Sequence, residues 1–173
     1  RAVRTTVTGR EAHASVPHRG ASAIFVANKL LGFLRALARE LADTADPDAG
    51  YDPPHPTINV GMIEGGSALN IVPRSCTFHW EYRPLPDADP DEILRRFEAF
   101  VADEYLDVLR ADGIEAEIVT EPVGSIPALP GEASSPAESL ALKLAGKNRT
   151  HRVSYGSEAG LFRAAGFGTV LCG

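Results

Sequence analysis

Cys76-Thr-Phe-His-Trp-Glu-Tyr-Arg83 alternates apolar and polar side chains without exception over eight residues. Successive residues of a strand point to opposite faces, so Cys76, Phe78, Trp80 and Tyr82 share a dry face and the residues between them a wet one. A strand with one wet face is typical of an antiparallel sheet that is covered on one side only. This stretch therefore predicts the sheet around which the chain is arranged.

Similar patterns on both sides of this strand predict the order strand, helix, strand, strand, helix, strand. Alternation predicts four strands, at residues 1–8, 57–64, 76–83 and 114–118. Apolar spacings of three and four predict two helices, at 21–41 and 89–113, the second with a capping sequence Asp89-Pro90-Asp91-Glu92 and a terminal Gly113. Two helices on one face of a four-stranded antiparallel sheet form a ferredoxin-like α+β sandwich. We expect it over residues 1–123.

Both helices have an apolar face. The buried face of the second helix is expected to consist of Leu94, Phe97, Val101, Tyr105 and Val108. The first helix carries one stripe that suffices to cover a sheet, made of Ile24, Ala27, Leu31, Leu34, Ala38 and Leu41. A second stripe lies beside it and either widens the core face or contacts a partner subunit: Val26, Leu30, Phe33 and Leu37.

The remainder of the chain follows a Pro/Gly-rich linker at residues 124–131. Its patterns predict a helix at 136–145, a short helix at 158–165 and a strand at 169–172. So few residues bury too little surface to form a core of their own. We interpret residues 124–173 as part of a second, larger domain.

Composition narrows the class of protein. The chain is 44% hydrophobic, carries a formal charge of −6, and has no basic stripe of the kind that binds nucleic acid. Its apolar runs are far shorter than the roughly 18 residues of a membrane span. No secretory signal opens the chain, and Cys76 and Cys172 are read as thiols rather than a disulfide framework. We expect a cytoplasmic protein that binds neither nucleic acid nor membrane.

His13 is the first candidate site residue, in a turn that runs from Gly9 to Gly20 and contains Pro17. A histidine there can titrate near neutral pH and donate a hydrogen bond outward. His18 lies in the same turn, but a zinc site would need further ligands and no cluster supplies them. His13 is therefore either a catalytic donor or an ordinary solvated turn residue.

Three further segments contain candidates, each with an ordinary alternative. Asn70, between Gly65-Gly66 and Pro73, either presents an oriented amide or closes its own turn. Arg83 either binds a carboxylate with two parallel hydrogen bonds or pairs with Glu81. Gly156-Ser157-Glu158 either offers backbone donors to an anion at a helix start or simply caps that helix.

Taken in order, these segments resemble the M20 family of metallohydrolases. The resemblance rests on Gly9–Ser15 with Pro17 and Gly20, Gly65-Gly66 with Asn70 and Pro73, Trp80–Arg83, and Tyr155–Gly160. Within that family, the last two segments favour the acetylornithine deacetylases over the succinyl-diaminopimelate desuccinylases.

The resemblance implies a two-domain subunit. A catalytic domain holds two zinc ions, or cobalt, and an inserted ferredoxin-like lid domain mediates homodimerisation. Residues 1–123 correspond to the lid and 124–173 to the return of the chain into the catalytic domain. The family's metal ligands and its glutamate base lie in segments that this sequence does not contain, so no metal ligand is assigned to it.

The resemblance also implies roles for the candidates. His13 reaches the partner subunit's active site and stabilises the oxyanion, and Asn70 lies near the same site. Arg83 binds a substrate carboxylate, and Gly156, Ser157 and Glu158 form a loop that contacts the substrate.

The implied activity is zinc-dependent hydrolysis of N-acetylornithine to ornithine and acetate, a step of arginine biosynthesis. The 173 residues alone are expected to be inactive. Two alternatives remain: another N-acyl amino acid hydrolase of the family, such as the desuccinylase, or a free-standing ferredoxin-like module that dimerises or binds a small molecule without catalysis.

Overall fold

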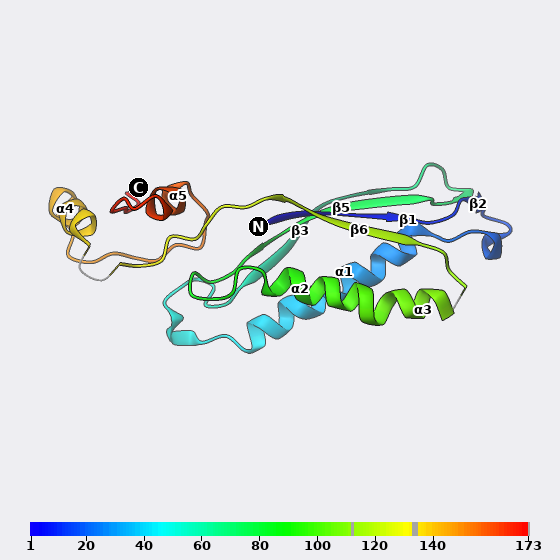
Figure 1. Cartoon of the computed structure of the whole chain (residues 1–173), viewed down its shortest axis with the longest axis horizontal. Coiled ribbons are helices and arrows are strands. Elements are labelled where there is room, and N and C mark those ends of the chain that lie inside the picture. Colours follow the sequence, from blue (N-terminus) through cyan, green and yellow to red (C-terminus); the bar gives the residue numbers. More distant parts are fainter. Residues whose placement is uncertain (112, 133–134, 173) are drawn as a thin grey trace.

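A computed structural model describes residues 1–111, 113–132 and 135–172. Its centre is a four-stranded antiparallel sheet with the strand order β3-β5-β1-β6. These strands are β1 (Ala2–Thr8), β3 (Thr57–Gly65), β5 (Ser75–Arg83) and β6 (Glu117–Gly124). α1 (Ala23–Asp43) and the α2–α3 helix cover one face of the sheet (Figure 1). The predicted ferredoxin-like α+β sandwich is confirmed.

β5 decides the layer arrangement, as its sequence predicts. Its four apolar side chains are each at most 2% exposed and face the helices. They meet Val3 and Val7 of β1 and Phe97 of the second helix in one core. The Thr5 hydroxyl brings a polar group into this layer from the centre of β1, where it accepts a hydrogen bond from Trp80 Nε1 at 3.1 Å.

α1 begins after Ser22, whose hydroxyl accepts a hydrogen bond from Phe25 N–H at 3.3 Å. The interpretation of its second stripe as a partner contact is wrong. Val26, Leu30 and Leu37 are buried against the sheet, together with Ala27 and Leu34 of the first stripe. The core face is therefore wide, and the large apolar side chains left exposed on α1 are Ile24 and Phe25 at its beginning.

The second helix begins at Glu92 rather than Asp89. It runs through α2 (Glu92–Ala99), a π-helical stretch (Phe100–Tyr105) and α3 (Leu106–Ala111). The Asp89 carboxylate accepts Asp91 N–H at 2.9 Å and pairs with Arg95, so it closes the preceding turn. Gly113, with φ +68°, ends the helix as predicted.

The buried side of this helix repeats every four residues. Its members are Ile93, Phe97, Val101, Tyr105 and Leu109. A spacing of four drifts around an α-helix of 3.6 residues per turn, and the wider π-helical turn offsets part of that drift. The stripe therefore ends on Leu109, and Val108, predicted for this face, lies outside the described side chains.

The last strand of the sheet is β6, three residues later than the predicted strand at 114–118. Ile114 N–H donates a hydrogen bond to Leu109 O at 2.8 Å. Ile114 therefore belongs to the end of the helix and not to the strand. β6 pairs with β1 from Glu117 opposite Thr8 to Gly124 opposite Ala2. The alternation at 114–118 thus covers a helix end and only the beginning of a strand.

Beyond the sheet the chain forms α4 (Pro136–Ala145) and α5 (Ala159–Ala164). Figure 1 shows both helices past the end of the sheet at which β6 finishes. α4 has the predicted bounds, with Ser135 before it and Gly146 after it at φ +63°. The prediction of a strand at 169–172 is wrong. These residues do not form a strand and pair with none of the strands of the described residues. No helix of the described residues is long and apolar enough to cross a membrane.

Candidate functional site

The turn that carries His13 is held in place by a second, short sheet. β2 (Ala12–His13) pairs with β4 (Ile71–Val72), with His13 opposite Ile71. The next backbone contact joins Ala14 N–H to Asn70 O at 2.8 Å. Two candidates that are far apart in sequence therefore lie side by side, both exposed, at one end of the domain.

The surroundings of His13 settle which ring nitrogen donates. Ser15 N–H lies 3.2 Å from Nδ1, and the Ser15 hydroxyl lies 2.7 Å from the same atom. A backbone N–H can only donate, so Nδ1 acts as the acceptor and the neutral ring carries its proton on Nε2. His13 is exposed, so its Nε2–H is a donor not used by these contacts with Ser15.

Asn70 is fixed through its backbone. Its carbonyl oxygen accepts Ala14 N–H, while its side chain is exposed beside the turn of His13. Gly66, at φ +82°, begins the loop that brings Asn70 to this position, a conformation that favours glycine. The amide is accordingly available for contact with another molecule.

A metal site is not formed by this pair of turns. Within the described ranges, no group of three or more His, Cys, Asp or Glu side chains is placed to hold a metal ion. His18 lies in the 3₁₀ turn Pro17–Arg19 of the same loop. The residues present do not provide the ligand set that zinc requires.

Arg83 lies at the other end of β5 and has the ordinary partner considered for it. Its Nε and Nη2 donate to one oxygen of Glu81 at 3.2 and 2.9 Å. Its Nη1 also donates to the backbone oxygen of Ser154 at 3.4 Å. Both ends of the ion pair are nearly half exposed, so the pair contributes little to stability and is readily exchanged for another carboxylate.

The segment Gly156-Ser157-Glu158 precedes α5. The Ser157 hydroxyl accepts Ala159 N–H at 3.2 Å. That donor at the helix start is therefore occupied within the chain, which matches the capping alternative. Gly156 and Glu158 are exposed, and the contact from Arg83 to Ser154 holds the approach to this loop against the end of β5.

The candidates thus form two groups, one near each end of the four-stranded sheet: β2, which carries His13, lies past one end, and α5, which follows the 154–158 segment, lies past the other (Figure 1). β5 spans the distance between them, because Ser75 pairs with Thr8 near the His13 turn and Arg83 pairs with Thr57 at the far end. Eight residues of a strand cover about 26 Å. The structure brings His13 to Asn70 and Arg83 to the 154–158 segment, but it does not bring the two groups together.

A cavity of about 840 Å³ opens near the His13 end, between the residue pair Gly9-Arg10 and the end of α3. Arg10 in its wall is paired with Glu115 at 3.0 Å. Further charged residues of the lining are Glu11, Arg74, Arg110 and Glu117. The lining thus holds three acidic and three basic side chains, whose formal charges cancel.

Sequence reasoning missed one set of contacts altogether. Arg152 binds the loop between α1 and β3, where its Nη1 donates to Ala49 O at 2.6 Å. Its guanidinium also lies over the ring of Tyr51, 5.0 Å from the centroid. The two sides are about a hundred residues apart, and no local spacing links them. The sequence feature that could have indicated this contact is Tyr51, an aromatic residue in an otherwise polar, Pro-rich loop.

Comparison with known proteins places these groups in context. Residues 1–108 match the family model described as a peptidase dimerisation domain, M20_dimer. An acetylornithine deacetylase of Myxococcus xanthus is 42% identical over 92 residues, 53% of this chain and 24% of the relative. One from Edwardsiella ictaluri is 32% identical over 115 residues, 65% of this chain and 30% of the relative. The chain thus spans between a quarter and a third of these relatives.

Solved structures show the same fold. A tripeptidase of Staphylococcus aureus matches with a TM-score of 0.63 and 24% identity, over 96% of this chain and 41% of the tripeptidase. A putative amidohydrolase/peptidase of Burkholderia cenocepacia matches with a TM-score of 0.58 and 27% identity, over 92% and 36% of the two chains. Both similarities extend past the sheet into the α4–α5 region.

Proposed function

The chain belongs to the M20 peptidase family through its dimerisation domain, and from this we propose that it is the dimerising, substrate-contacting part of a longer cytoplasmic amidohydrolase that deacetylates N-acetylornithine. Residues 1–123 form the lid and 124–173 belong to the catalytic domain in this proposal. Exposed apolar side chains in the α4–α5 region support the assignment of 124–173 to a larger catalytic domain, in which further residues would cover them. These side chains are Leu140, Leu144, Leu161, Phe162 and Phe167.

The separation of the two candidate groups is the observation that carries the proposal. His13 and Asn70 lie at one end of the sheet, and Arg83 with the 154–158 segment lies at the other. About 26 Å of strand is too far for both groups to contact one amino acid within a single subunit. Two copies of the chain, arranged antiparallel about a two-fold axis, bring the His13 end of each to the Arg83 end of its partner.

The two edges of the sheet differ in a way that supports such a dimer. β6, at one edge, carries Glu117, Glu121 and Pro122, which are features that block pairing of strands. β3, at the other, exposes Met62 at 60% and Ile63 at 56%. Ile24 lies where a side chain at Gly66, just after this strand, would meet it, and Phe25 beside it is 78% exposed. A second copy that pairs along β3 covers this apolar edge.

Each group has a role that follows from its chemistry. The Nε2–H of His13 donates to the oxyanion that develops on the amide carbonyl in the partner's site, and Asn70 adds an amide beside it. Arg83 exchanges Glu81 for the substrate carboxylate, next to Gly156, Ser157 and Glu158. The zinc or cobalt ions proposed for the whole enzyme need ligands from outside the described residues, which do not fit such a site.

The experiment is to extend the gene on both sides and assay the longer protein against N-acetylornithine, N-succinyl-diaminopimelate and other N-acyl amino acids. We expect an upstream His-x-Asp motif, hydrolysis of N-acetylornithine in preference to the others, and no hydrolysis by the 173-residue chain alone. A preference for the succinyl substrate would assign the desuccinylase activity instead. A gene that starts and stops at these residues, with no hydrolysis, would leave only the non-catalytic dimerisation module.

A further inference from the structure

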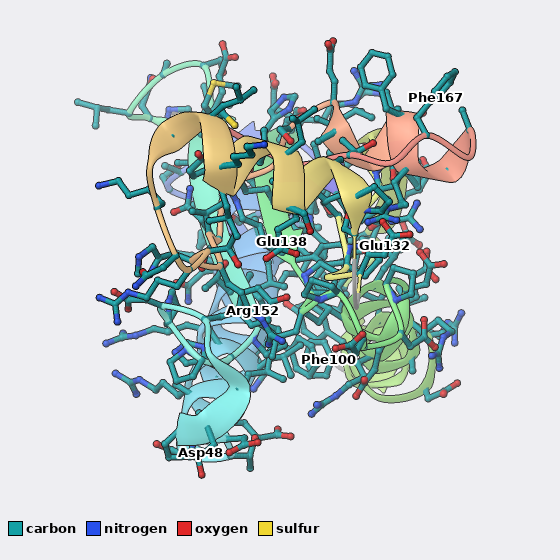
Figure 2. The ribbon with its side chains drawn as sticks, turned by 90° about the vertical axis from the view of Figure 1, so that its left-hand side faces the viewer. Asp48, Phe100, Glu132, Glu138, Arg152 and Phe167 are labelled. Atoms are coloured by element: carbon teal, nitrogen blue, oxygen red, sulfur yellow. The ribbon has the colours of Figure 1, made fainter. Side chains whose placement is uncertain are left out.

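The loop at residues 46–56, between α1 and β3, binds the side chain of Arg152 from the distant 150–158 segment. Arg152 Nη1 donates to Ala49 O at 2.6 Å, and its guanidinium lies over the Tyr51 ring at 5.0 Å. Figure 2 shows Arg152 between Glu138 of α4 and the loop that Asp48 marks. Two different interactions thus act on the same guanidinium.

The shape of the loop is adapted to this contact. Gly50 has φ +75°, in the left-handed region, and it follows the carbonyl that binds Arg152. A side chain at Gly50 would begin 3.5 to 3.9 Å from the Arg152 guanidinium and stem. The loop turns here with its backbone against the arginine, and a planar guanidinium fits between this backbone and an aromatic face better than an ammonium does.

A second residue of the same segment binds the same loop. The Ser154 hydroxyl donates to Asp52 O at 2.6 Å. The backbone oxygen of Ser154 in turn accepts Arg83 Nη1 at 3.4 Å. The loop therefore holds the segment from one side through Arg152 and Ser154, while the end of β5 holds it from the other.

We propose that Arg152 is a positioning residue, which docks the 152–154 segment on the 46–56 loop and thereby holds Gly156, Ser157 and Glu158 beside Arg83. This inference rests on the proposed function for the substrate it serves. Ser154 is two residues before Gly156, so docking of the one sets the reach of the other. Arg83 and residues 156–158 then contact one substrate carboxylate as a preformed site. No conformational entropy is lost in ordering them at each binding event.

The docking itself is tested on the 173-residue chain by hydrogen–deuterium exchange with mass spectrometry. Arg152→Ala should speed exchange about tenfold in peptides of 45–56, where Asp48 and Ala49 N–H are hydrogen-bonded to Asp46, the factor expected from loss of one charged hydrogen bond. Arg152→Lys should restore little, because it lacks the planar fork. Arg149→Ala, at an exposed arginine just before this segment, is the matched control and should leave the exchange of these peptides unchanged. Unchanged exchange in Arg152→Ala would overturn the proposal.

The positioning role is tested in the longer enzyme. Arg152→Ala should raise KM about tenfold for the carboxylate-bearing substrate with kcat nearly unchanged, and should add little in an Arg83→Ala background. An active enzyme whose KM is insensitive to Arg152→Ala would overturn the positioning role even if exchange changes. Absence of any N-acyl hydrolysis would instead count against the proposed function, while the exchange result still decides whether the segment docks.

Discussion

His13 lies beside one end of the four-stranded sheet and Arg83 lies at the other end, with β5 running between them. The turn of His13 adjoins the end at which Ser75 pairs with Thr8, and Arg83 is opposite Thr57 at the other end. We propose that these two ends are half-sites of one kind of active site. In the proposed dimer each active site takes one half from each subunit.

Mixed dimers provide the first test of this arrangement. In the longer enzyme, His13→Ala and Arg83→Ala homodimers should both have low activity. After subunit exchange between equal amounts, half of the dimers are mixed, and each mixed dimer has one site with both residues intact. We expect activity to return to about a quarter of the wild-type value, measured as initial rates, because half-sites in trans complement each other.

The matched control is a mixture of His13→Ala with a His13→Ala/Arg83→Ala double variant. No mixed dimer in that sample contains an intact site, so activity should stay low. Failure of the first mixture to recover activity, with exchange verified by mass spectrometry, would show that both residues act within one subunit.

His13→Ala alone should reduce kcat by about 10²–10³-fold in the longer enzyme, the cost of removing one oxyanion donor. Metal content, measured by mass spectrometry of the purified protein, should stay equal to wild type, since His13 belongs to no ligand cluster of the described residues. Ser15→Ala is the control, because it removes the hydroxyl near Nδ1 but keeps the backbone donor. Its effect should be small, and loss of metal from His13→Ala would assign a ligand role instead.

Local patterns predict the parts of this fold that are held by local forces. The β5 alternation, the bounds of α4 and the Gly113 helix end follow from side-chain period, capping and backbone freedom. The start of β6 does not follow from local patterns, because the hydrogen bond from Ile114 N–H to Leu109 O keeps Ile114 at the helix end. The β2–β4 pairing, two residues a strand, is too short to leave a period in the sequence.

The candidate site shows the same division. Individual residue types identified His13, Asn70 and Arg83, yet their grouping depends on strand register over the whole domain. Arg152 was missed because its partners are one backbone oxygen and one ring about a hundred residues away. A carbonyl acceptor is present in every residue and leaves no mark on the sequence.

Thr5 tests the polar contact inside the core. Thr5→Val removes the acceptor of Trp80 Nε1 at a site where Thr5 is 0% exposed. We expect a loss of about 1–3 kcal/mol in the free energy of unfolding from the buried, unpaired indole N–H. Thr6→Val, which loses only the contact with Thr77 on the open face, should cost about 0.5 kcal/mol or less. Equal losses in urea denaturation would contradict this explanation, and Thr5→Ser should recover most of the stability.

The two cysteines should differ in reactivity. Cys172 is exposed, whereas Cys76 is 1% exposed, and burial raises the pKa of the Cys76 thiol. A thiol-specific reagent at pH 8 should modify Cys172 in the native chain and reach Cys76 only after unfolding, because the thiolate is the reactive form. Peptide mass mapping identifies the site, and Cys172→Ser should abolish native labelling. Labelling of Cys76 in the native chain would show that the β5 face opens.

Ile63→Lys tests the edge of the sheet at which a second copy is proposed to pair. Ile63 is opposite Phe78, on the side of the helices, yet it is 56% exposed, so the chain itself leaves it uncovered. A charge there resists pairing along β3 at little cost to the monomer. Light scattering should give twice the 18.4 kDa chain mass for the wild type and the single mass for Ile63→Lys. Val119→Lys, at the β6 edge and 42% exposed, should remain dimeric, and dissociation by this variant alone would move the interface to β6.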